Sequence, residues 1–183
     1  GSIRLMNGAT GNQISVVFGD DADDFLGGFI TGLSNSNYVI TSKEEDKDGI
    51  SKASSVRLMN GSTGVQISVL FGDLEGDALG QRIDDGFIAH NAVTALSNNN
   101  YVITSPSDDN GAIIDAGSVR LMDGTTGIQI GGIIFGDQED DKIGESGVTV
   151  LSNDNYVIAS SRDDNGLILD AGSVQLVSGT TGD

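Results

Sequence analysis

The sequence predicts an all-β protein of tandem four-stranded antiparallel blades, β-propeller-like in architecture, with a β-solenoid-like repeat stack as the alternative. Two observations predict this class. Three short segments recur along the 183 residues, which indicates an array of small units. The 27 Gly, the single Pro and the many Ser, Thr and Asn residues between short apolar runs are typical of a turn-rich β protein. The pattern allows at most one helical turn, at Asp137–Ile143.

The first recurring segment defines the repeat. It begins at Gly1 (GSIRLMNGATG), Ser54 (SSVRLMNGSTG), Gly117 (GSVRLMDGTTG) and Gly172 (GSVQLVSGTTG), at intervals of 53, 63 and 55 residues. The middle interval is longer because of an insertion between Gly80 and Ala92. We therefore treat the chain as one array of about three blades, with units at roughly 1–53, 54–116 and 117–171 and a partial unit at 172–183.

Each unit is expected to hold four strands, named A to D. Strand A is predicted at Ile30–Leu33, Val93–Leu96 and Val148–Leu151, and strand B at Tyr38–Ser42, Tyr101–Ser105 and Tyr156–Ser160. Strand C is predicted at Ser2–Met6, Ser55–Met59, Ser118–Met122 and Ser173–Val177, and strand D at Gln13–Phe18, Gln66–Phe71 and Gln129–Phe135. Asn-Gly or Asp-Gly follows the first three C strands and favours a C–D hairpin, because both residues accept positive φ.

Charge and missing motifs exclude several functions. The 27 acidic and 9 basic residues give a net charge of −18, which repels nucleic acids and anionic membrane surfaces. No apolar run is long enough for a transmembrane helix, so we expect no membrane insertion. There is no Cys and no motif of a hydrolase nucleophile, zinc protease or P-loop. Because the acidic pairs recur in every unit, whereas an active site is normally built once, we expect no enzyme.

One resemblance supports the propeller reading. The run from Asp24-Phe-Leu-Gly27 through strand A to Asn37-Tyr-Val-Ile-Thr-Ser42 resembles the FG-GAP repeat of integrin-α-type propellers. The resemblance implies a propeller blade. It does not bring that family's calcium loop, because the A–B turns Ser34–Asn37, Ser97–Asn100 and Ser152–Asn155 lack its carboxylates, Asp154 excepted.

Two other acidic elements are candidate calcium sites, since Ca²⁺ takes six to eight oxygen ligands. The B–C loops contribute Asp108, Asp109, Asn110 and Asp115 in one unit and Asp163, Asp164, Asn165 and Asp170 in the next. The Phe-Gly-Asp-x3-Asp element, between strand D and the next strand A, contributes Asp73 with Asp77 and Asp137 with Asp141. The alternative for both is a turn whose side chains accept backbone hydrogen bonds, which we favour.

Other recurring residues have structural interpretations. Tyr38, Tyr101 and Tyr156 are expected in the core rather than at a ligand. Arg4, Arg57 and Arg120, replaced by Gln175 in the last copy, are expected to pair with an acidic residue across strands or blades.

These observations favour a non-enzymatic structural repeat protein, extracellular or on a bacterial cell surface, whose precursor carries an export signal upstream of Gly1. The alternative is an adhesin or lectin-like module that recognises a glycan or protein through the insertion Gln81–Ala89. Three blades are too few for an ordinary closed propeller, and the last C strand has no D strand beside it. We therefore expect association with copies of the chain or with flanking repeats, as a ring or a filament.

Overall fold

The computed structural model describes residues 1–84 and 88–183 and confirms the all-β class. Over those residues the strands form five antiparallel sheets, and Asp137–Ile143 consists of bends and turns without the helical turn that the sequence allowed. No helix in this part of the chain could cross a membrane. Residues 85–87 belong to the insertion Gln81–Ala89 that was predicted as a recognition loop, and they lie outside the described residues.

Three of the sheets are blades whose neighbouring strands follow one another in the chain. The first blade comprises β3 (Leu26–Gly32), β4 (Tyr38–Ser42), β5 (Ser55–Met59) and β6 (Gln66–Phe71). The second comprises β9 (Val93–Ala95), β10 (Tyr101–Ser105), β11 (Ser118–Met122) and β12 (Gln129–Phe135). The third has the three strands β13 (Val148–Val150), β14 (Tyr156–Ser160) and β15 (Ser173–Val177).

Two hairpins complete the described sheets. The N-terminal hairpin pairs β1 (Ser2–Met6) with β2 (Gln13–Phe18), which are strands of type C and D. The insertion forms the pair β7 (Gln81–Asp84) and β8 (Ile88–Asn91). Strands B, C and D begin and end where the sequence predicted. Strand A ends one residue before its predicted end in all three blades. In the first blade it also starts earlier, because a bulge between Leu26 and Phe29 holds two glycines ahead of the regular pairing.

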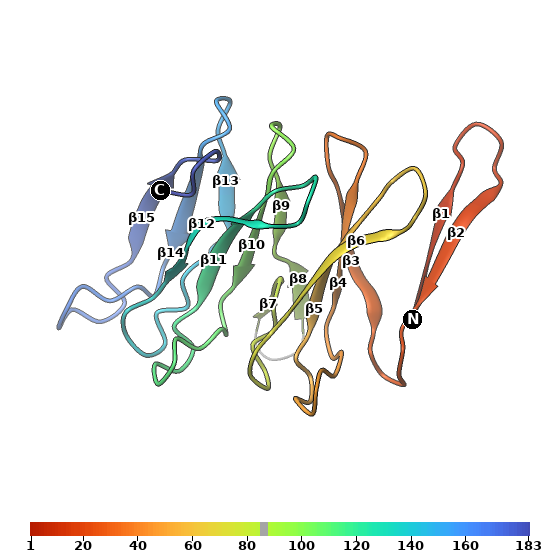
Figure 1. The fold of residues 1–183 in the computed structure, drawn as a ribbon. Helices are drawn as coiled ribbons and strands as arrows, with labels where there is room; N and C mark the ends of the chain where they lie inside the picture. The colour runs from red at the N-terminus through yellow and green to blue at the C-terminus, as the bar shows by residue number, and fades with distance from the viewer. Residues whose placement is uncertain (85–87) are drawn as a thin grey trace.

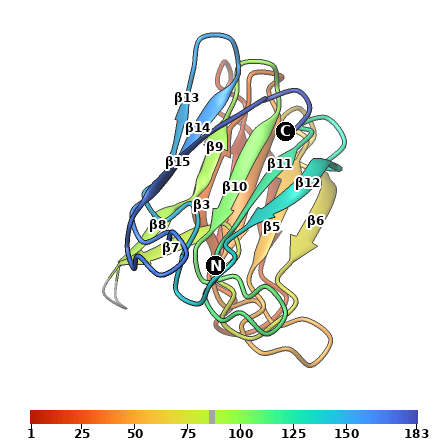
Figure 2. The same cartoon turned by 90° about the vertical axis from the view of Figure 1, so that its left-hand side faces the viewer.

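The sheets lie side by side in an open row (Figure 1), with the N-terminal hairpin at one end and the third blade at the other. Figure 2, seen from the third blade, shows the blades one behind another. The A–B and C–D turns lie at one end of every blade, and the B–C loops at the opposite end (Figure 1). Neighbouring sheets in the row thus meet face to face.

The alternation of side chains along each strand gives these faces different residues. The front face of a blade carries Tyr and Ile of strand B and the last residue of strand C: Tyr38, Ile40, Met59; Tyr101, Ile103, Met122; Tyr156, Ile158, Val177. The back face carries Val of strand B and two apolar residues of strand C: Val39, Val56, Leu58; Val102, Val119, Leu121. The back of one blade packs on the front of the next, so strands B and C of the first two blades are covered on both faces.

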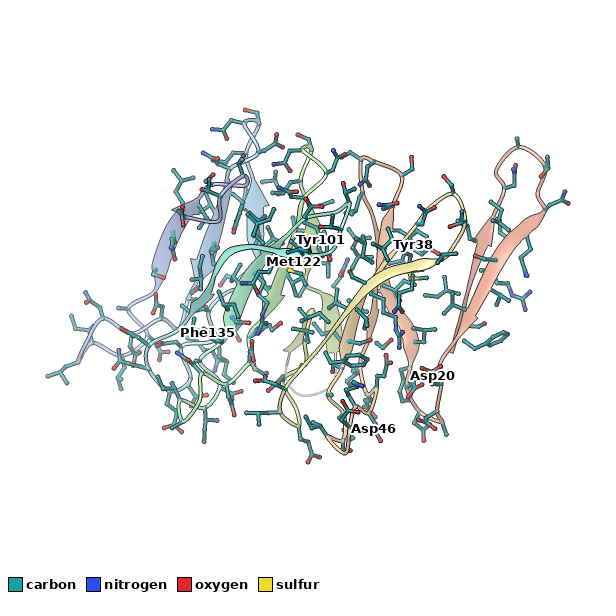
Figure 3. All side chains as sticks on the ribbon, in the orientation of Figure 1. Asp20, Tyr38, Asp46, Tyr101, Met122 and Phe135 are labelled. Atoms are coloured by element: carbon teal, nitrogen blue, oxygen red, sulfur yellow. The ribbon has the colours of Figure 1, made fainter. Side chains whose placement is uncertain are left out.

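The recurring tyrosines are core residues, as predicted. Tyr101 and Tyr156 are almost completely buried and Tyr38 is nearly so. In Figure 3, Tyr101 lies beside Met122, its partner across β10 and β11. Burial raises the pKa of Tyr156 to about 12, so its hydroxyl stays protonated at neutral pH.

Candidate functional sites at the blade junctions

The structure brings two separately predicted acidic elements together. Asp73 and Asp77, in the loop after β6, lie with Asp108 of the next blade's B–C loop, their carboxylate oxygens within 4.8 Å of one another. The group Asp137, Asp141 and Asp163 repeats this arrangement at the following junction. We call these groups the first and second acidic clusters. Each cluster joins two blades, which the linear spacing of its members does not reveal.

The remaining predicted ligands lie outside the clusters. Asp109 Oδ1 accepts the backbone N–H of Asp115 at 2.8 Å, and Asp164 Oδ1 accepts that of Asp170 at 2.7 Å. Asp115 also pairs with Lys142 through Nζ at 3.0 Å. Asn110 and Asn165 each form a backbone bridge across the same loop, to Ile113 and Ile168. Asp109 and Asp164 therefore act as the loop-closing side chains that the alternative interpretation described, whereas Asn110 and Asn165 close the loop through their backbone.

Turn formation also accounts for Asp77 and Asp141, the buried residues that the Phe-Gly-Asp-x3-Asp element contributes to the two clusters. Asp77 Oδ2 accepts the N–H groups of Asp73 at 2.9 Å and Leu74 at 2.8 Å. Asp141 Oδ2 accepts the corresponding two N–H groups, and its Oδ1 accepts the N–H of Asp164 at 3.0 Å. The favoured prediction, a tight turn held by backbone hydrogen bonds, thus describes both residues. A cation in either cluster would bind through the carboxylate oxygens that these hydrogen bonds leave free.

The two clusters differ in charge compensation. Arg120 Nη2 lies 2.8 Å from Asp108 Oδ2, with both side chains buried, so the first cluster contains an internal cation. In the first blade, Arg57 forms the equivalent pair with Glu45. Figure 3 labels Asp20 and Asp46 at this end of the blades. The third blade has Gln175 at this position, and within the described residues no Lys, Arg or His pairs with the second cluster. Its negative charge is therefore the less compensated of the two.

Burial and neighbouring charge alter the acidity of the first cluster. Burial raises the pKa of Asp77 to about 6, and the charges of Asp108 and Asp73 add to the effect, while the Leu74 N–H opposes it. Burial also raises the pKa of Asp108, against the lowering influence of Arg120. In the absence of a metal, Asp77 therefore gains or loses its proton around pH 6.

This acidity predicts a pH-dependent stability. The pKa of Asp77 in the folded protein, about 6, lies above the ordinary 3.8, so the folded state binds the proton more tightly than the unfolded chain. Its contribution is fully present below the unfolded value and is lost as the pH rises through about 6. With a chelator present, we expect the melting temperature to rise from pH 7 to pH 5, and Asp77→Asn to flatten that rise. Asp48→Asn, an exposed control, should keep the wild-type slope; equal slopes for both variants would contradict the assignment.

The opposite end of each junction is held by a ladder of asparagines. Asn35 and Asn37, in the A–B turn of the first blade, donate from Nδ2 to the carbonyl of Gly124 in the next C–D turn, at 2.8 and 2.9 Å. Asn98 and Asn100 make the same two bonds, at 2.8 and 2.9 Å, to Gly179. The sequence of these turns indicates only that they lack the carboxylates of a calcium loop, Asp154 excepted. The recurring Asn-x-Asn pattern is the sequence signal for these bonds, and the acceptor is a backbone carbonyl of the next blade.

Glycine is required where the C–D turn meets its neighbours. A Cβ on Gly124 would overlap the carbonyl oxygen of Asn99 and lie 2.7 Å from Leu33 Cδ1 of the preceding blade. Gly179 is enclosed in the same way by Asp154 and Leu96. A Cβ on Gly8 of the N-terminal hairpin would meet nothing within 4 Å. Gly61 of the first blade is enclosed by the carbonyl of Ser36, so of these four equivalent turns only the one at Gly8 is open.

The insertion also borders a pocket beside the first blade. The pocket has a volume of about 250 Å³ and is lined by Phe25, Gly28, Phe29, Lys43, Glu44 and Gln81. Gln81 is 1% exposed, and its Nε2 has no hydrogen-bond partner. The other blades have Ala78 and Lys142 at the position of Phe25, so this pocket is not repeated along the row.

Fold and junctions together define a tandem β-blade repeat protein. The chain belongs to the family described as a repeat of unknown function (DUF5650), whose model matches residues 32–72, 95–145 and 150–183. Each matched segment begins at the last residue of strand A and runs through strands B and C of the same blade, so each match covers most of one blade. A comparison with curated proteins finds no match. The matching family is not FG-GAP, so the likeness to the FG-GAP repeat remains a resemblance.

Proposed function

We propose that the chain is a non-enzymatic structural repeat protein of the cell surface or extracellular space, which forms arrays with copies of itself or with flanking repeats. The uniformity of the junctions between blades supports this structural role. The same apolar faces, Asn ladder and loop contacts recur at successive junctions, as expected when the repeat itself is the functional element. The charge of −18 keeps such a surface soluble and disfavours nucleic acids and anionic membranes as partners.

One observation carries the proposal. On the back face of the third blade, Val174 and Leu176 are 75% and 61% exposed, whereas Val56, Leu58, Val119 and Leu121, at the same positions, are at most 2% exposed. Every other back face is covered by a following blade. An exposed apolar surface whose equivalents are all buried is typical of an interaction site.

The mass of the particle isolated from the cells that make it tests the proposal. We expect a surface or extracellular particle much heavier than 18.8 kDa, or a longer chain containing further blades. A single 18.8 kDa species in the cytosol would contradict both the assembly and the location.

Calcium stabilisation is a further part of the proposal. The second acidic cluster supports it, because its three carboxylates converge without an internal cation. Residues Asp137, Asp141 and Asp163 would supply the ligands, and the ion would join the second and third blades. We expect calcium to raise the melting temperature above its value in EDTA, and Asp163→Asn to reduce that rise. Asp170→Asn, outside the cluster, is the control; equal calcium effects in the two variants would contradict this site.

A binding module is the second candidate function. The pocket at Phe25 favours it, because two aromatic rings, an ion pair and an unpartnered amide converge there once in the array. A glycan or a protein segment would be the ligand. Binding on a glycan or peptide array that Phe25→Ala abolishes would support this function, and binding that is unaffected would exclude the pocket.

A further inference from the structure

We infer that strand β6 pairs edge to edge with β6 of a second copy, antiparallel and across a two-fold axis. This inference rests on the proposed function and names a lateral contact through which two copies join. The strand belongs to the first blade, which lies between the N-terminal hairpin and the second blade (Figure 1). The surroundings of β6 are therefore described on both sides of its blade.

The outer edge of β6 has no strand beside it. Within the described residues β6 pairs only with β5. The N–H of Gly72 points inward, to the carbonyls of Ala53 and Ser54 at 3.0 and 3.4 Å. Backbone direction alternates along each strand of an antiparallel pair, so the N–H and C=O groups of Phe71 and Val69 point outward. Such a row of free donors and acceptors is a template for another strand.

The sequence of this edge lacks the usual protection against pairing. Natural edge strands carry Lys, Pro, inward-pointing charges or bulges. The three D strands read QISVVF, QISVLF and QIGGIIF, without a charged residue or a proline. In β12 a bulge between Val119 and Leu121, with Gly131 at a φ of 71°, interrupts the pairing. In β6 the bulge lies at the beginning of the strand, beside Met59, and residues 68–71 pair regularly.

The inner edges of the blades, formed by the A strands, are not equally free. Thr31 of β3 donates from Oγ1 to the carbonyl of Val93 in β9 at 3.3 Å, and Asn91 Nδ2 donates to Thr31 Oγ1 at 2.8 Å. These two neighbouring A strands are thus linked by side chains, whereas β6 and β12 lie along the opposite side of the row (Figure 2). The outer edge is therefore the side of the first blade that a second molecule can reach.

Charge favours a second copy of the same strand as the partner. Residues 58–72 form a run without a charged side chain, in a chain whose net charge is −18. Two such chains repel each other, so they approach most closely where neither presents a charge. A basic peptide would instead be drawn to the acidic loops. The uncharged edge therefore fits another uncharged strand, and β6 of a second copy supplies one.

The geometry of β6 selects a two-fold axis beside Leu70. Val69 then lies opposite Phe71 of the other copy, and their outward N–H and C=O groups exchange hydrogen bonds on both sides of the axis. Aromatic and β-branched residues that face each other form a favourable pair in antiparallel sheets. The same register puts Asp73, the first acidic residue after the strand, opposite Ile67 and not opposite another carboxylate.

Disulfide formation between two cysteine variants of the full chain tests this contact, because the chain has no natural Cys. A site-specific measurement is needed, since β2 has the same sequence pattern and regular pairing. Val69 and Phe71 lie opposite each other across the axis, so an oxidised mixture of Val69→Cys and Phe71→Cys should yield linked dimers. Each variant alone should yield at most about a tenth as much, because equal positions lie diagonally, at the limit of disulfide reach. Salt should raise the yield by screening the repulsion.

The same pair of substitutions in β12 is the matched control. Ile133 and Phe135 are at the positions of Val69 and Phe71, but the bulge interrupts this edge, so Ile133→Cys mixed with Phe135→Cys should stay unlinked. Urea unfolding checks that all four variants are folded. Equal linking in the control mixture, or in Val69→Cys alone, would overturn the contact in favour of random collision.

Two further results separate this contact from the proposed function. A wild type that sediments as a monomer at every concentration and salt would overturn the β6 contact, while the mass of the native particle still decides the proposed function. A heavy native particle whose copies do not link between positions 69 and 71 would leave the proposed function in place and exclude β6 as the contact.

Discussion

Replacing Gly124 by alanine is expected to cost at least about 3 kcal/mol of unfolding free energy. The new methyl group would overlap the Asn99 carbonyl oxygen and press on Leu33 of the first blade. Such overpacking typically costs about 1–3 kcal/mol. Moving the turn also strains the two bonds from Asn35 and Asn37, each contributing about 1 kcal/mol. Urea unfolding of the purified chain measures the sum.

Gly8 provides the matched control for this substitution. It occupies the same position in the N-terminal hairpin, and an added methyl group would meet nothing there. At concentrations where the chain is monomeric, Gly8→Ala should therefore shift stability by less than about 0.5 kcal/mol. Similar losses for Gly124→Ala and Gly8→Ala would mean that the cost lies in the turn itself and not in its contacts with Asn99 and Leu33.

Replacing Arg120 by glutamine is expected to destabilise the chain by about 3–5 kcal/mol in the presence of a chelator. The change removes the only cationic partner described for buried Asp108 and leaves it beside Asp73 and Asp77. It also gives the first cluster the residue that the third blade has naturally at position 175. Calcium should then recover more stability in the variant than in the wild type, because the ion can replace the lost guanidinium.

Arg4 is the control for this second experiment. Its guanidinium bonds to Gln13 at 2.9 Å on an exposed surface, with no carboxylate cluster beside it. Arg4→Gln should therefore change stability by less than about 0.5 kcal/mol. A loss for Arg120→Gln no larger than that for Arg4→Gln would show that Asp108 is stable without its partner.

Strand positions were predictable because the blade satisfies local rules. Asn60-Gly61 begins a turn in which Asn60 Oδ1 accepts the N–H groups of Ser62 and Thr63, at 2.9 and 3.0 Å, a pattern that the dipeptide alone indicates. The start of β3 was not predictable in the same way. Its first residues are paired through a bulge that contains glycines, and the sequence carries no apolar alternation there.

The composition of the acidic clusters was less predictable. Asp77 and Asp108 are 31 residues apart and meet only because consecutive blades stack face to face. Sequence periodicity locates equivalent positions in different blades, but it does not say which loop of one blade touches which loop of the next. The Asn-x-Asn ladder was missed for the same reason, since its acceptor is a backbone carbonyl that any residue could supply.

The open row of blades has a consequence for how the chain unfolds. Since each blade meets only the sheets before and after it, the energetics approximate a one-dimensional Ising model, with one term per blade and one per interface. Opening then starts at a terminal sheet of an array, because such a sheet has a single neighbour. A defect in the middle divides the row into two segments that melt separately. Contacts remain local however many blades are added, so longer arrays gain stability without the slow search that distant strand pairing imposes.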